Sequence, residues 1–313
     1  MTLRQMEYLL AVVDEGSFTR AAERLFVSQP ALSHQVKALE QSVGGPLLER
    51  RPHAVYLTPL GRAFLPHATA AVRAAEDAQR AARAVGQLES GELRIATLHS
   101  IALGVVPAAI RAWRLSHPDV SFELHEYVNI DELADQMRLG VADVAVSTRP
   151  RGWDGPLRTL GLEELVVVLA VDDPLVRGRR TKVSLDLLAD RPWVLYRPDN
   201  GLSPVVAEAC AAAGFNPRPA VRTHHTATAV QLAAAGLGPA LVPENVVEPG
   251  FTGALLRPDP PVHRELVAFT RDDPSPLVTA FSDVLAEHAV IDPRQPSILP
   301  GRQPARAAAH ATS

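Results

Sequence analysis

The sequence predicts an α+β chain in which a small, mainly helical N-terminal domain is joined by a long helix to a two-lobed α/β domain. Three observations support this organisation. The 313 residues exceed the usual size of one hydrophobic core. Apolar residues recur at helical spacing near the N-terminus, and an alanine-rich stretch follows them. Strand-like and helix-like segments then alternate from residue 91 onward, as in α/β domains.

The overall composition is that of a globular protein. Hydrophobic residues make up 47% and charged residues 21%, which argues against both disorder and membrane embedding. There is no apolar run long enough for a membrane span, and the N-terminus lacks the pattern of a signal peptide, so we expect a cytoplasmic protein without a membrane partner. The single cysteine, Cys210, cannot form an internal disulfide.

The net charge of -4 does not identify a partner, because it averages over parts with different roles. Residues 1–62 contain seven basic and six acidic side chains, so basicity alone would not mark them as a DNA-binding segment. The 11 histidines are scattered and do not match the spacing of a known metal site. We therefore expect no metal, no cofactor and no catalytic residue.

Two short helices are predicted at the N-terminus. Leu3, Met6, Leu10 and Val13 recur at helical spacing, and Gly16 ends this pattern. Ser17 is a good N-cap for a second helix from Phe18 to about Phe26.

The third predicted helix has two different faces. Ser28 can cap it, and Pro30 falls in its first turn, where a missing N–H costs little. Its apolar stripe consists of Leu32, Val36, Leu39 and Val43. The opposite face carries Gln29, Pro30, Ser33, His34 and Lys37. From spacing alone this polar face could simply be solvated, but two helices joined by a tight turn also describe a helix-turn-helix.

A longer pattern decides between these alternatives. The stretch GSFTRAAERLFVSQPALSHQVKALEQSVGGPLLERRPHAVYLTPLG closely resembles the DNA-binding domain of the LysR-type transcriptional regulators. The similarity runs through Ala21-Ala22, the segment from Ser28 to Ser33, Leu39-Glu40 and the segment from Leu57 to Gly61. The sequence departs from the family at Leu47-Leu48-Glu49-Arg50, where a Leu-Phe-x-Arg run is usual, although one aliphatic exchange in a core should be tolerated.

This resemblance implies a winged helix-turn-helix and gives roles to its residues. Gln29 and Ser33 would hydrogen-bond base edges, Pro30 would contact a thymine methyl, and Lys37 would meet phosphate. His34 occupies a position where relatives often carry a longer polar side chain. The wing strands are expected at Pro46–Arg50 and Ala54–Leu57, so that Arg50, Arg51 and His53 flank the DNA backbone.

A long helix is predicted from about Thr58 to Gln87, because this stretch is rich in alanine and is interrupted only by Pro66 after Gly61. Its apolar seam consists of Leu60, Phe64, Val72, Ala75, Ala82 and Val85. A seam far from a core needs a partner, which a second copy of the chain would supply. The alternative is a helix packed on the rest of its own chain. We expect a homodimer or a homotetramer that binds double-stranded promoter DNA at an interrupted palindrome, with RNA polymerase as a further candidate partner.

The remaining segments predict two lobes, with RELVAFTR and the helix from Pro276 to Val290 returning to the first. The domain is similar to type II periplasmic binding proteins, as the effector domains of LysR-type regulators are. The predicted boundaries are 1–62 for the winged helix-turn-helix, 63–90 for the linker helix and 91–292 for the effector domain. Within the last, lobe I spans about 91–163 and 267–292, and lobe II about 164–266. Residues 293–313 are expected to be a disordered tail.

Ligands of such lobes sit beyond the carboxyl ends of the strands, near helix N-termini. The residues expected to bind the effector there are Ser100, Ile101, Asn129, Thr148, Asn200, Gly201, Thr223 and His224. Polar residues at such positions can also be plain helix caps. Helix N-termini favour negative charge, and Arg149 and Arg197 lie close in sequence to two of these loops, which favours an organic anion as the effector.

The predicted function is therefore sequence-specific transcriptional regulation under the control of a small-molecule effector. An enzyme would need a nucleophile–base pair, a metal cluster or a phosphate loop, and the sequence offers no such pattern. A second alternative is an architectural DNA-binding protein whose C-terminal lobes serve only assembly. A metabolite that alters DNA binding would favour sensing over architecture, and turnover of a metabolite would indicate an enzyme.

Overall fold

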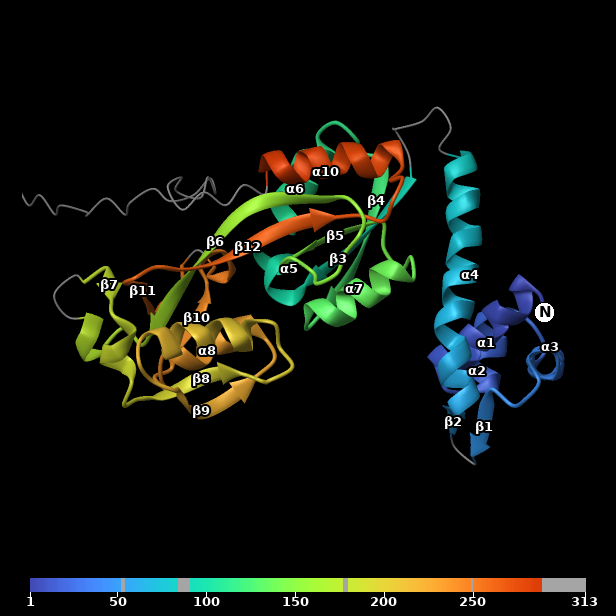
Figure 1. Cartoon of the computed structure of the whole chain (residues 1–313), viewed down its shortest axis with the longest axis horizontal. Helices are drawn as coiled ribbons and strands as arrows, with labels where there is room; N and C mark the ends of the chain where they lie inside the picture. Colours follow the sequence, from blue (N-terminus) through green and yellow to red (C-terminus); the bar gives the residue numbers. More distant parts are fainter. Residues whose placement is uncertain (52–53, 84–90, 177–179, 249, 289–313) are drawn as a thin grey trace, which may run out of the picture.

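The computed structural model describes residues 1–51, 54–83, 91–176, 180–248 and 250–288 (Figure 1). The N-terminal domain consists of three helices followed by a two-stranded antiparallel wing. Its elements are α1 (Leu3–Glu15), α2 (Phe18–Arg24), α3 (Gln29–Val43), β1 (Leu48–Arg51) and β2 (Ala54–Leu57). The three helices share a core in which Leu9, Val12, Leu32, Val36 and Leu39 are completely buried.

The predicted helix starts are confirmed. The side chain of Ser17 accepts a hydrogen bond from the backbone N–H of Arg20, and that of Ser28 accepts one from Ala31. Helix α2 ends at Arg24, earlier than predicted, because Phe26 adopts a positive φ of 53° in the turn before α3.

The wing begins two residues later than predicted. The carboxylate of Glu40 on α3 accepts hydrogen bonds from the backbone N–H groups of Leu47, at 2.9 Å, and Leu48, at 3.1 Å. This anchor ties the chain to the helix before strand pairing starts, and the ladder then runs from Leu48 opposite Leu57 to Arg51 opposite Ala54. The predicted position of His53 lies outside the described residues.

Helix α4 (Pro59–Arg83) starts directly after the wing. The Thr58 hydroxyl donates to the carbonyl of Pro46 at 2.7 Å and accepts from the N–H of Gly61 at 2.9 Å. A Cβ atom on Gly61 would lie 2.1 Å from the carbonyl oxygen of Leu47. The Thr58-Pro59-Leu60-Gly61 motif thus fixes the junction between wing and helix, and only glycine permits this close approach.

Part of the α4 seam is covered within the chain itself. Val72 is only 6% exposed because it packs with Ala68 against Met6 of α1. The seam prediction therefore needs correction at Val72, whose side chain is occupied by its own domain. Val85 and the side chain of Ala82 lie outside the described part of the chain.

The C-terminal domain has two lobes, each with its own core. Lobe I contains β3 (Gly91–Leu98), α5 (His99–Gly104), α6 (Val106–Arg114), β4 (Val120–Tyr127), α7 (Ile130–Arg138), β5 (Val144–Ser147) and α10 (Pro276–His288). Lobe II contains η1 (Pro174–Val176), β7 (Lys182–Val183), η2 (Leu185–Leu188), β8 (Pro192–Tyr196), α8 (Leu202–Ala212), β9 (Arg218–Thr223), α9 (Thr226–Ala234), β10 (Ala240–Pro243), η3 (Glu244–Val246) and β11 (Ala254–Pro258).

Two long strands run between the lobes: β6 (Leu157–Leu169) and β12 (Val262–Phe269). They pair antiparallel within a sheet of order β4-β3-β5-β12-β6-β11-β7, in which β10 also pairs with β6. Strand β3 is parallel to β4 and β5, whereas β12 is antiparallel to β5. RELVAFTR thus returns to the first lobe, as predicted, and it does so with reversed direction.

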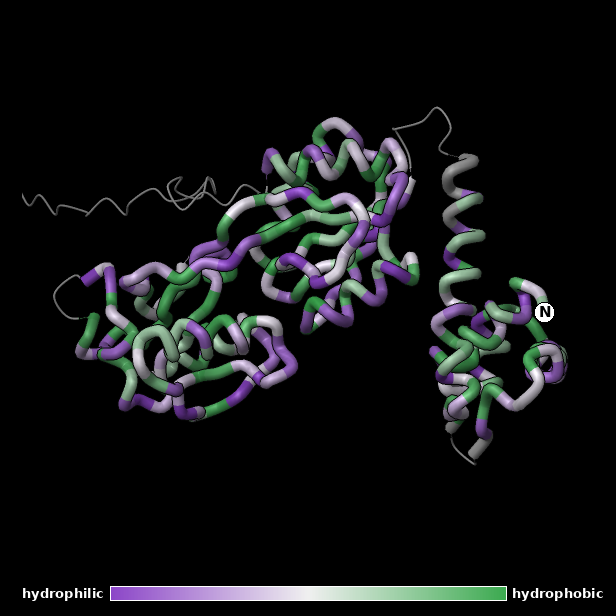
Figure 2. Tube along the Cα trace, in the orientation of Figure 1, coloured by the Kyte–Doolittle hydropathy of each residue, from purple (hydrophilic) through white to green (hydrophobic). Residues whose placement is uncertain are grey.

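Hydropathy follows this arrangement (Figure 2). Strands β5 and β10 inside the lobes are hydrophobic and buried, whereas a hydrophilic stretch marks β6 and β12 where they pass between the lobes. This stretch includes Glu163 on β6 and Arg264 on β12, which are 1% and 6% exposed. Charged residues are rarely buried unless they are paired. The pocket between the lobes, described below, explains why these two are buried.

The segment after β3 forms two helices, α5 and α6, which are separated at Val105. Pro107 lies in the first turn of α6, where its missing N–H is tolerated. Gly104 at the end of α5 packs against the side chain of Asn245, so the break lets lobe I approach lobe II closely.

Among the described residues, no helix is both long and apolar enough to cross a membrane.

Candidate DNA-binding face and effector cleft

Helix α3 separates its apolar and polar residues cleanly. Leu32, Val36 and Leu39 are completely buried, while Gln29, Pro30, His34 and Lys37 are exposed. Ser33 is partly buried. The predicted DNA-facing residues of this helix therefore share one surface at or near its N-terminal half. The side chains of Arg50 and Arg51, at the end of β1, lie outside the description.

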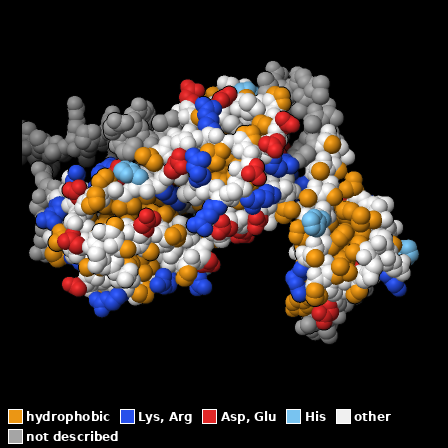
Figure 3. All heavy atoms as spheres, in the orientation of Figure 1, with side chains coloured by type: hydrophobic (Ala, Val, Ile, Leu, Met, Phe, Trp, Pro, Cys, Tyr) orange, Lys and Arg blue, Asp and Glu red, His pale blue; other side chains and the backbone are white. Residues whose placement is uncertain are grey.

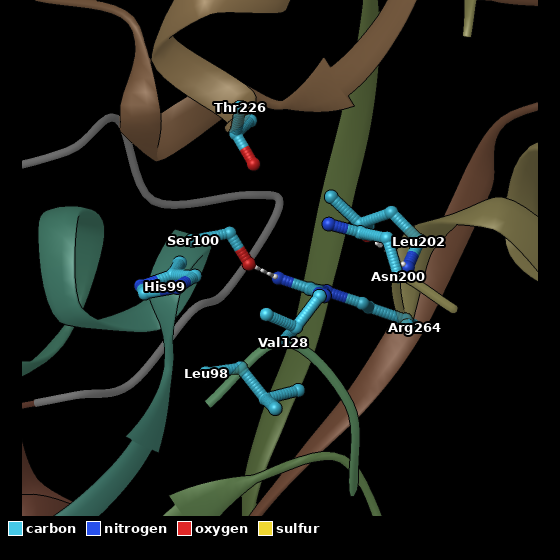
Figure 4. A pocket seen from close by; sticks show the side chains of 9 residues that line it. Leu98, His99, Ser100, Val128, Asn200, Leu202, Thr226 and Arg264 are labelled. Atoms are coloured by element: carbon cyan, nitrogen blue, oxygen red, sulfur yellow. Dashed lines mark hydrogen bonds between the residues drawn. The ribbon is translucent and has the colours of Figure 1, made fainter. Parts of the chain in front are cut away.

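A small pocket lies between lobes I and II (Figure 4). Its empty space is about 230 Å³ when open solvent is counted, and the enclosed part has room for about one water molecule. Lobe I contributes residues from the end of β3, the start of α5 and the loop after β4, and lobe II contributes the starts of α8 and α9. The lining residues are Leu98, His99, Ser100, Val128, Asn200, Gly201, Leu202, Thr226 and Arg264.

The floor of the pocket is polar and buried. Arg264 donates from Nη2 to the Ser100 hydroxyl at 2.7 Å, which Figure 4 shows as the contact joining β12 to α5. Its Nε donates to the carboxylate of Glu163 on β6. The other oxygen of Glu163 accepts from Nδ2 of Asn245 at 2.7 Å. One chain of hydrogen bonds therefore connects α5 of lobe I, the two crossover strands and η3 of lobe II.

The lobes also touch through their backbones. The N–H of Gly201 in lobe II donates to the carbonyl of Val128 in lobe I at 3.0 Å. The Asn200 side chain supports this turn, since its Nδ2 donates to the His224 carbonyl at 2.7 Å and its Oδ1 accepts from the N–H of Leu202 at 2.8 Å. These contacts hold the two lobes against each other beside the pocket.

Two histidines face each other at the rim of the cleft. The rings of His99 in lobe I and His225 in lobe II have centroids 5.4 Å apart and are tilted by 55°. Nδ1 of His99 lies 2.7 Å from the carboxylate of Glu126, which orients the ring. Deeper in lobe II, burial raises the pKa of Tyr196, so its phenol is neutral beside Thr226 and acts as a hydrogen-bonding group.

Three of the predicted effector residues line the pocket: Ser100, Asn200 and Gly201. The other five do not. Ile101 belongs to the core of lobe I, and Asn129 caps α7 by accepting from the N–H of Glu132 at 2.9 Å. The carbonyl of Thr148 accepts from the hydroxyl of its neighbour Ser147.

The remaining two predicted residues, Thr223 and His224, shape the loop before α9. Thr223 Oγ1 accepts from the N–H of His225, and the His224 carbonyl accepts from Asn200. The two arginines considered as anion ligands are also engaged elsewhere. Arg149 forms an ion pair with Glu265 at 3.0 Å, and Arg197 lies 3.8 Å from Asp199.

Sequence reasoning missed Arg264 because it sits within a strand rather than at a strand end. The one available signal was a run of charges, His263-Arg264-Glu265, interrupting an apolar strand pattern. Sequence reasoning also missed five lining residues that lie within or beside the loops expected to face a ligand. They are Leu98, His99, Val128, Leu202 and Thr226.

Cys210, the single cysteine of the chain, lies outside this cleft. Burial raises the pKa of the Cys210 thiol to about 12, so it stays protonated inside the core of lobe II. Within the described residues, no three His, Cys, Asp or Glu side chains are grouped so that they could hold a metal ion.

Comparisons with known families match both parts of the chain. Residues 3–62 match the model described as bacterial regulatory helix-turn-helix protein, lysR family, and residues 86–290 match the LysR substrate binding domain. The Hca operon transcriptional activator HcaR of Escherichia coli is 32% identical over 295 residues, which are 92% of this chain and 98% of HcaR. The regulator BenM of Acinetobacter baylyi is 30% identical over 246 residues, covering 78% of this chain and 80% of BenM.

Solved structures of full-length regulators show the same architecture. CbnR, a LysR family transcriptional regulator, superimposes with a TM-score of 0.72 at 25% identity, over 93% of this chain and all of CbnR. Full-length CbnR in complex with its target DNA gives the same score over 92% of this chain. The predicted fold class is confirmed. The chain belongs to the LysR family of transcriptional regulators, with a helix-turn-helix DNA-binding domain and an effector-binding domain.

Proposed function

We propose that this regulator reads its operator through the N-terminal half of α3 and changes its DNA binding when a small molecule occupies the cleft between the lobes. The observation that carries the first part is the exposed, polar face of α3, which stands opposite a fully buried stripe. Gln29 and Ser33 supply base contacts, Pro30 an apolar contact and Lys37 a phosphate contact. His34, Arg50, Arg51 and His53 are assigned to the DNA backbone and groove edges. The complex of the relative CbnR with its target DNA supports this proposal.

Binding measurements on operator and random DNA test the assignment. Gln29→Ala and Ser33→Ala should each weaken operator binding by about 1–3 kcal/mol, the range for a good base contact, and reduce discrimination. Lys37→Ala should weaken binding to both DNAs and reduce the salt dependence. Gln41→Ala is the matched control, since Gln41 is exposed at the other end of α3. Wild-type discrimination in both Gln29→Ala and Ser33→Ala would contradict the recognition-helix assignment.

We also propose self-association as a dimer, or as a tetramer built from dimers, with α4 at one interface. Hydrophobic side chains gather over α1 and α4 on the face seen in Figure 3, and Leu3 and Leu60 remain 43% and 39% exposed. An operator made of an interrupted palindrome would match a twofold dimer.

Sedimentation tests this interface. Ala74→Glu introduces a charge on an exposed position of α4, whereas Val72→Glu would disrupt packing against α1 and confuse dissociation with unfolding. Ala74→Glu should therefore produce monomers without loss of secondary structure. Unchanged assembly would remove this face of α4 from the interface.

The effector part of the proposal rests on the polar floor of the cleft and on its lining, which comes from both lobes. A ligand that touches both lobes favours one relative orientation of the lobes and, through the assembly, one spacing of the DNA-binding heads. Effector binding is thereby transmitted to the promoter, where RNA polymerase would act. The protein works in the cytoplasm, where its DNA lies, and has no turnover of its own and no cofactor.

Operator binding by the full chain, measured with a metabolite panel, tests the sensing role. A response supports sensing, no response favours the architectural alternative, and turnover of a metabolite would indicate an enzyme.

We propose the division at 1–62, 63–90 and 91–292 as the working boundaries of the three parts. The family matches over 3–62 and 86–290 support it. The predicted tail, 293–313, lies outside the described residues.

A further inference from the structure

Phe26 is the most exposed large hydrophobic residue in the described part of the chain, with 96% of its surface accessible to solvent. It lies in the turn between α2 and α3, outside the core that these helices share. A single exposed apolar side chain is common on protein surfaces and needs no explanation by itself. Phe26 needs one because its backbone conformation also disfavours a phenylalanine.

The end of α2 fixes the backbone of Phe26 in a left-handed conformation. The N–H of Phe26 donates to the carbonyl of Glu23 at 3.2 Å, and the N–H of Val27 donates to the carbonyl of Ala22 at 3.0 Å. These two hydrogen bonds form a Schellman motif, whose left-handed residue is usually glycine and sometimes asparagine. With a φ of 53°, a bulky side chain is strained there. Phe26 therefore costs folding free energy, and its exposed ring recovers none of it by burial.

This turn adjoins the end of α3 that is proposed to read DNA. Phe26 comes two residues before Ser28, the cap of α3, and three residues before Gln29. The Cα atoms of Phe26 and Gln29 are therefore at most about 11 Å apart, because each residue spans no more than about 3.6 Å. The major groove is about 12 Å wide. When Gln29 is inserted among the base edges, the side chain of Phe26 is within reach of the same groove.

The chemistry of the turn selects the part of DNA that Phe26 can contact. The turn reads Leu-Phe-Val-Ser over residues 25–28 and contains no charged side chain, so it neither repels nor pairs with phosphate. An aromatic ring offers an apolar surface instead. The apolar group on the base edges of the major groove is the 5-methyl group of thymine, and phenylalanine is among the side chains that contact it.

We propose that Phe26 is a further specificity-determining residue of the DNA-binding face, and that its ring contacts the methyl group of a thymine beside the base pairs read by Gln29. This inference rests on the proposed function of α3. The Schellman motif holds the ring out of the domain core and next to the helix end that enters the groove. Pro30 makes its apolar contact from within α3, so the two contacts fall on different base pairs.

Phe26→Asn separates this role from a structural one. Asparagine tolerates the left-handed conformation, so the thermal unfolding midpoint should stay at or above that of wild type. The DNA probe is a duplex that the wild-type chain selects from a random-sequence pool. Binding of the full chain to this duplex should weaken about tenfold, as for exposing part of a buried aromatic side chain. Binding to a scrambled duplex should not change.

Val171→Asn is the matched control. Val171 is 67% exposed and lies in lobe II, away from the DNA-binding domain, so its exchange should change neither affinity nor discrimination.

Deoxyuridine tests the partner of the ring, because it differs from thymidine only by the missing 5-methyl group. Each thymidine of the selected duplex is replaced singly. Wild-type binding should weaken about fourfold at one position beside the base pairs whose readout Gln29→Ala abolishes, as for the loss of one buried methyl group. Phe26→Asn should be insensitive to deoxyuridine at that position and should keep the sensitivity at the thymine that Pro30 contacts.

Four results would overturn the inference on DNA. They are wild-type affinity of Phe26→Asn for the selected duplex, the same deoxyuridine sensitivity in Phe26→Asn and wild type at every position, no sensitive position beside the Gln29 contacts, and a lowered unfolding midpoint. Dissociation of Phe26→Asn in sedimentation would place the ring in a protein interface instead. Loss of transcriptional regulation with intact DNA binding would indicate a contact with RNA polymerase, and both results would also overturn it.

Failure of this inference can be distinguished from failure of the proposed function. If Gln29→Ala loses discrimination between the selected and scrambled duplexes while Phe26→Asn keeps it, α3 still reads the operator and only the role of Phe26 fails. If Gln29→Ala and Ser33→Ala both keep discrimination, the recognition-helix assignment fails as well.

Discussion

The polar face of α3 proposed to read DNA and the cleft between the lobes are built in opposite ways. Every side chain assigned to the face on α3 comes from one nine-residue stretch, 29–37, and is oriented by local caps and by one buried stripe. The cleft takes its lining from several separate segments, and its floor depends on Arg264 and Ser100, which are 164 positions apart. The first surface is a property of a helix, whereas the second is a property of how two lobes close on each other.

This difference predicts where single substitutions act most strongly. The largest effect is expected for Arg264→Met, which leaves the carboxylate of Glu163 buried without its cation. Loss of one partner from a buried ion pair costs about 3–5 kcal/mol of folding free energy. Chemical unfolding should show this loss, and Arg264→Met/Glu163→Gln should recover most of it. If the single variant is as stable as wild type, the pair contributes little to closing the floor.

Gly61→Ala probes the local construction of the N-terminal domain. The added Cβ would collide with the carbonyl of Leu47, so the wing must move away from α4. We expect a loss of about 1–3 kcal/mol, as for other overpacked sites, together with weaker DNA binding. Gly152→Ala is the control: its φ of 58° imposes backbone strain, but its Cβ would meet open space. A larger loss in the control would mean that close approach is not what Gly61 provides.

Asn200→Ala tests whether the turn at the cleft is held by side chains. It removes hydrogen bonds to the His224 carbonyl and the Leu202 N–H, and a loss of about 1–2 kcal/mol in unfolding free energy is expected. Asn216→Ala, at an exposed asparagine, should change stability little. Equal effects in the two variants would show that the turn is fixed by the backbone alone.

The smallest expected effect concerns pH. Hydrogen bonding from Arg149, and then from Thr159, holds the pKa of Glu265 below its usual range. A carboxyl with a lowered folded-state pKa adds stability above its unfolded pKa and loses it as pH falls through the folded value. The stability difference between wild type and Glu265→Gln should therefore be small near neutral pH, because the pair is exposed, and should vanish in acid. A difference that grows in acid would contradict this sign.

The sequence by itself determined the N-terminal domain and the family. Caps at Ser17 and Ser28, the apolar stripe of α3 and the motif from Leu57 to Gly61 all act within short stretches, so their physical meaning can be read in order along the chain. The alternation of strands and helices likewise predicted a two-lobed α/β domain. In the cleft it located three residues that line the pocket: Ser100, Asn200 and Gly201.

Only the tertiary structure decided which polar groups meet. Asn129, at one such loop, caps α7, and Arg149 pairs with Glu265 instead of facing a ligand. In the sequence, Arg264 is an ordinary charged residue within a strand. In the fold, β6 and β12 cross between the lobes and bury it beside Glu163 and Ser100. Side chains on one helix share a face because of helical periodicity, which sequence encodes directly. Side chains on different lobes meet through packing and closure, and these depend on contacts far apart in the chain.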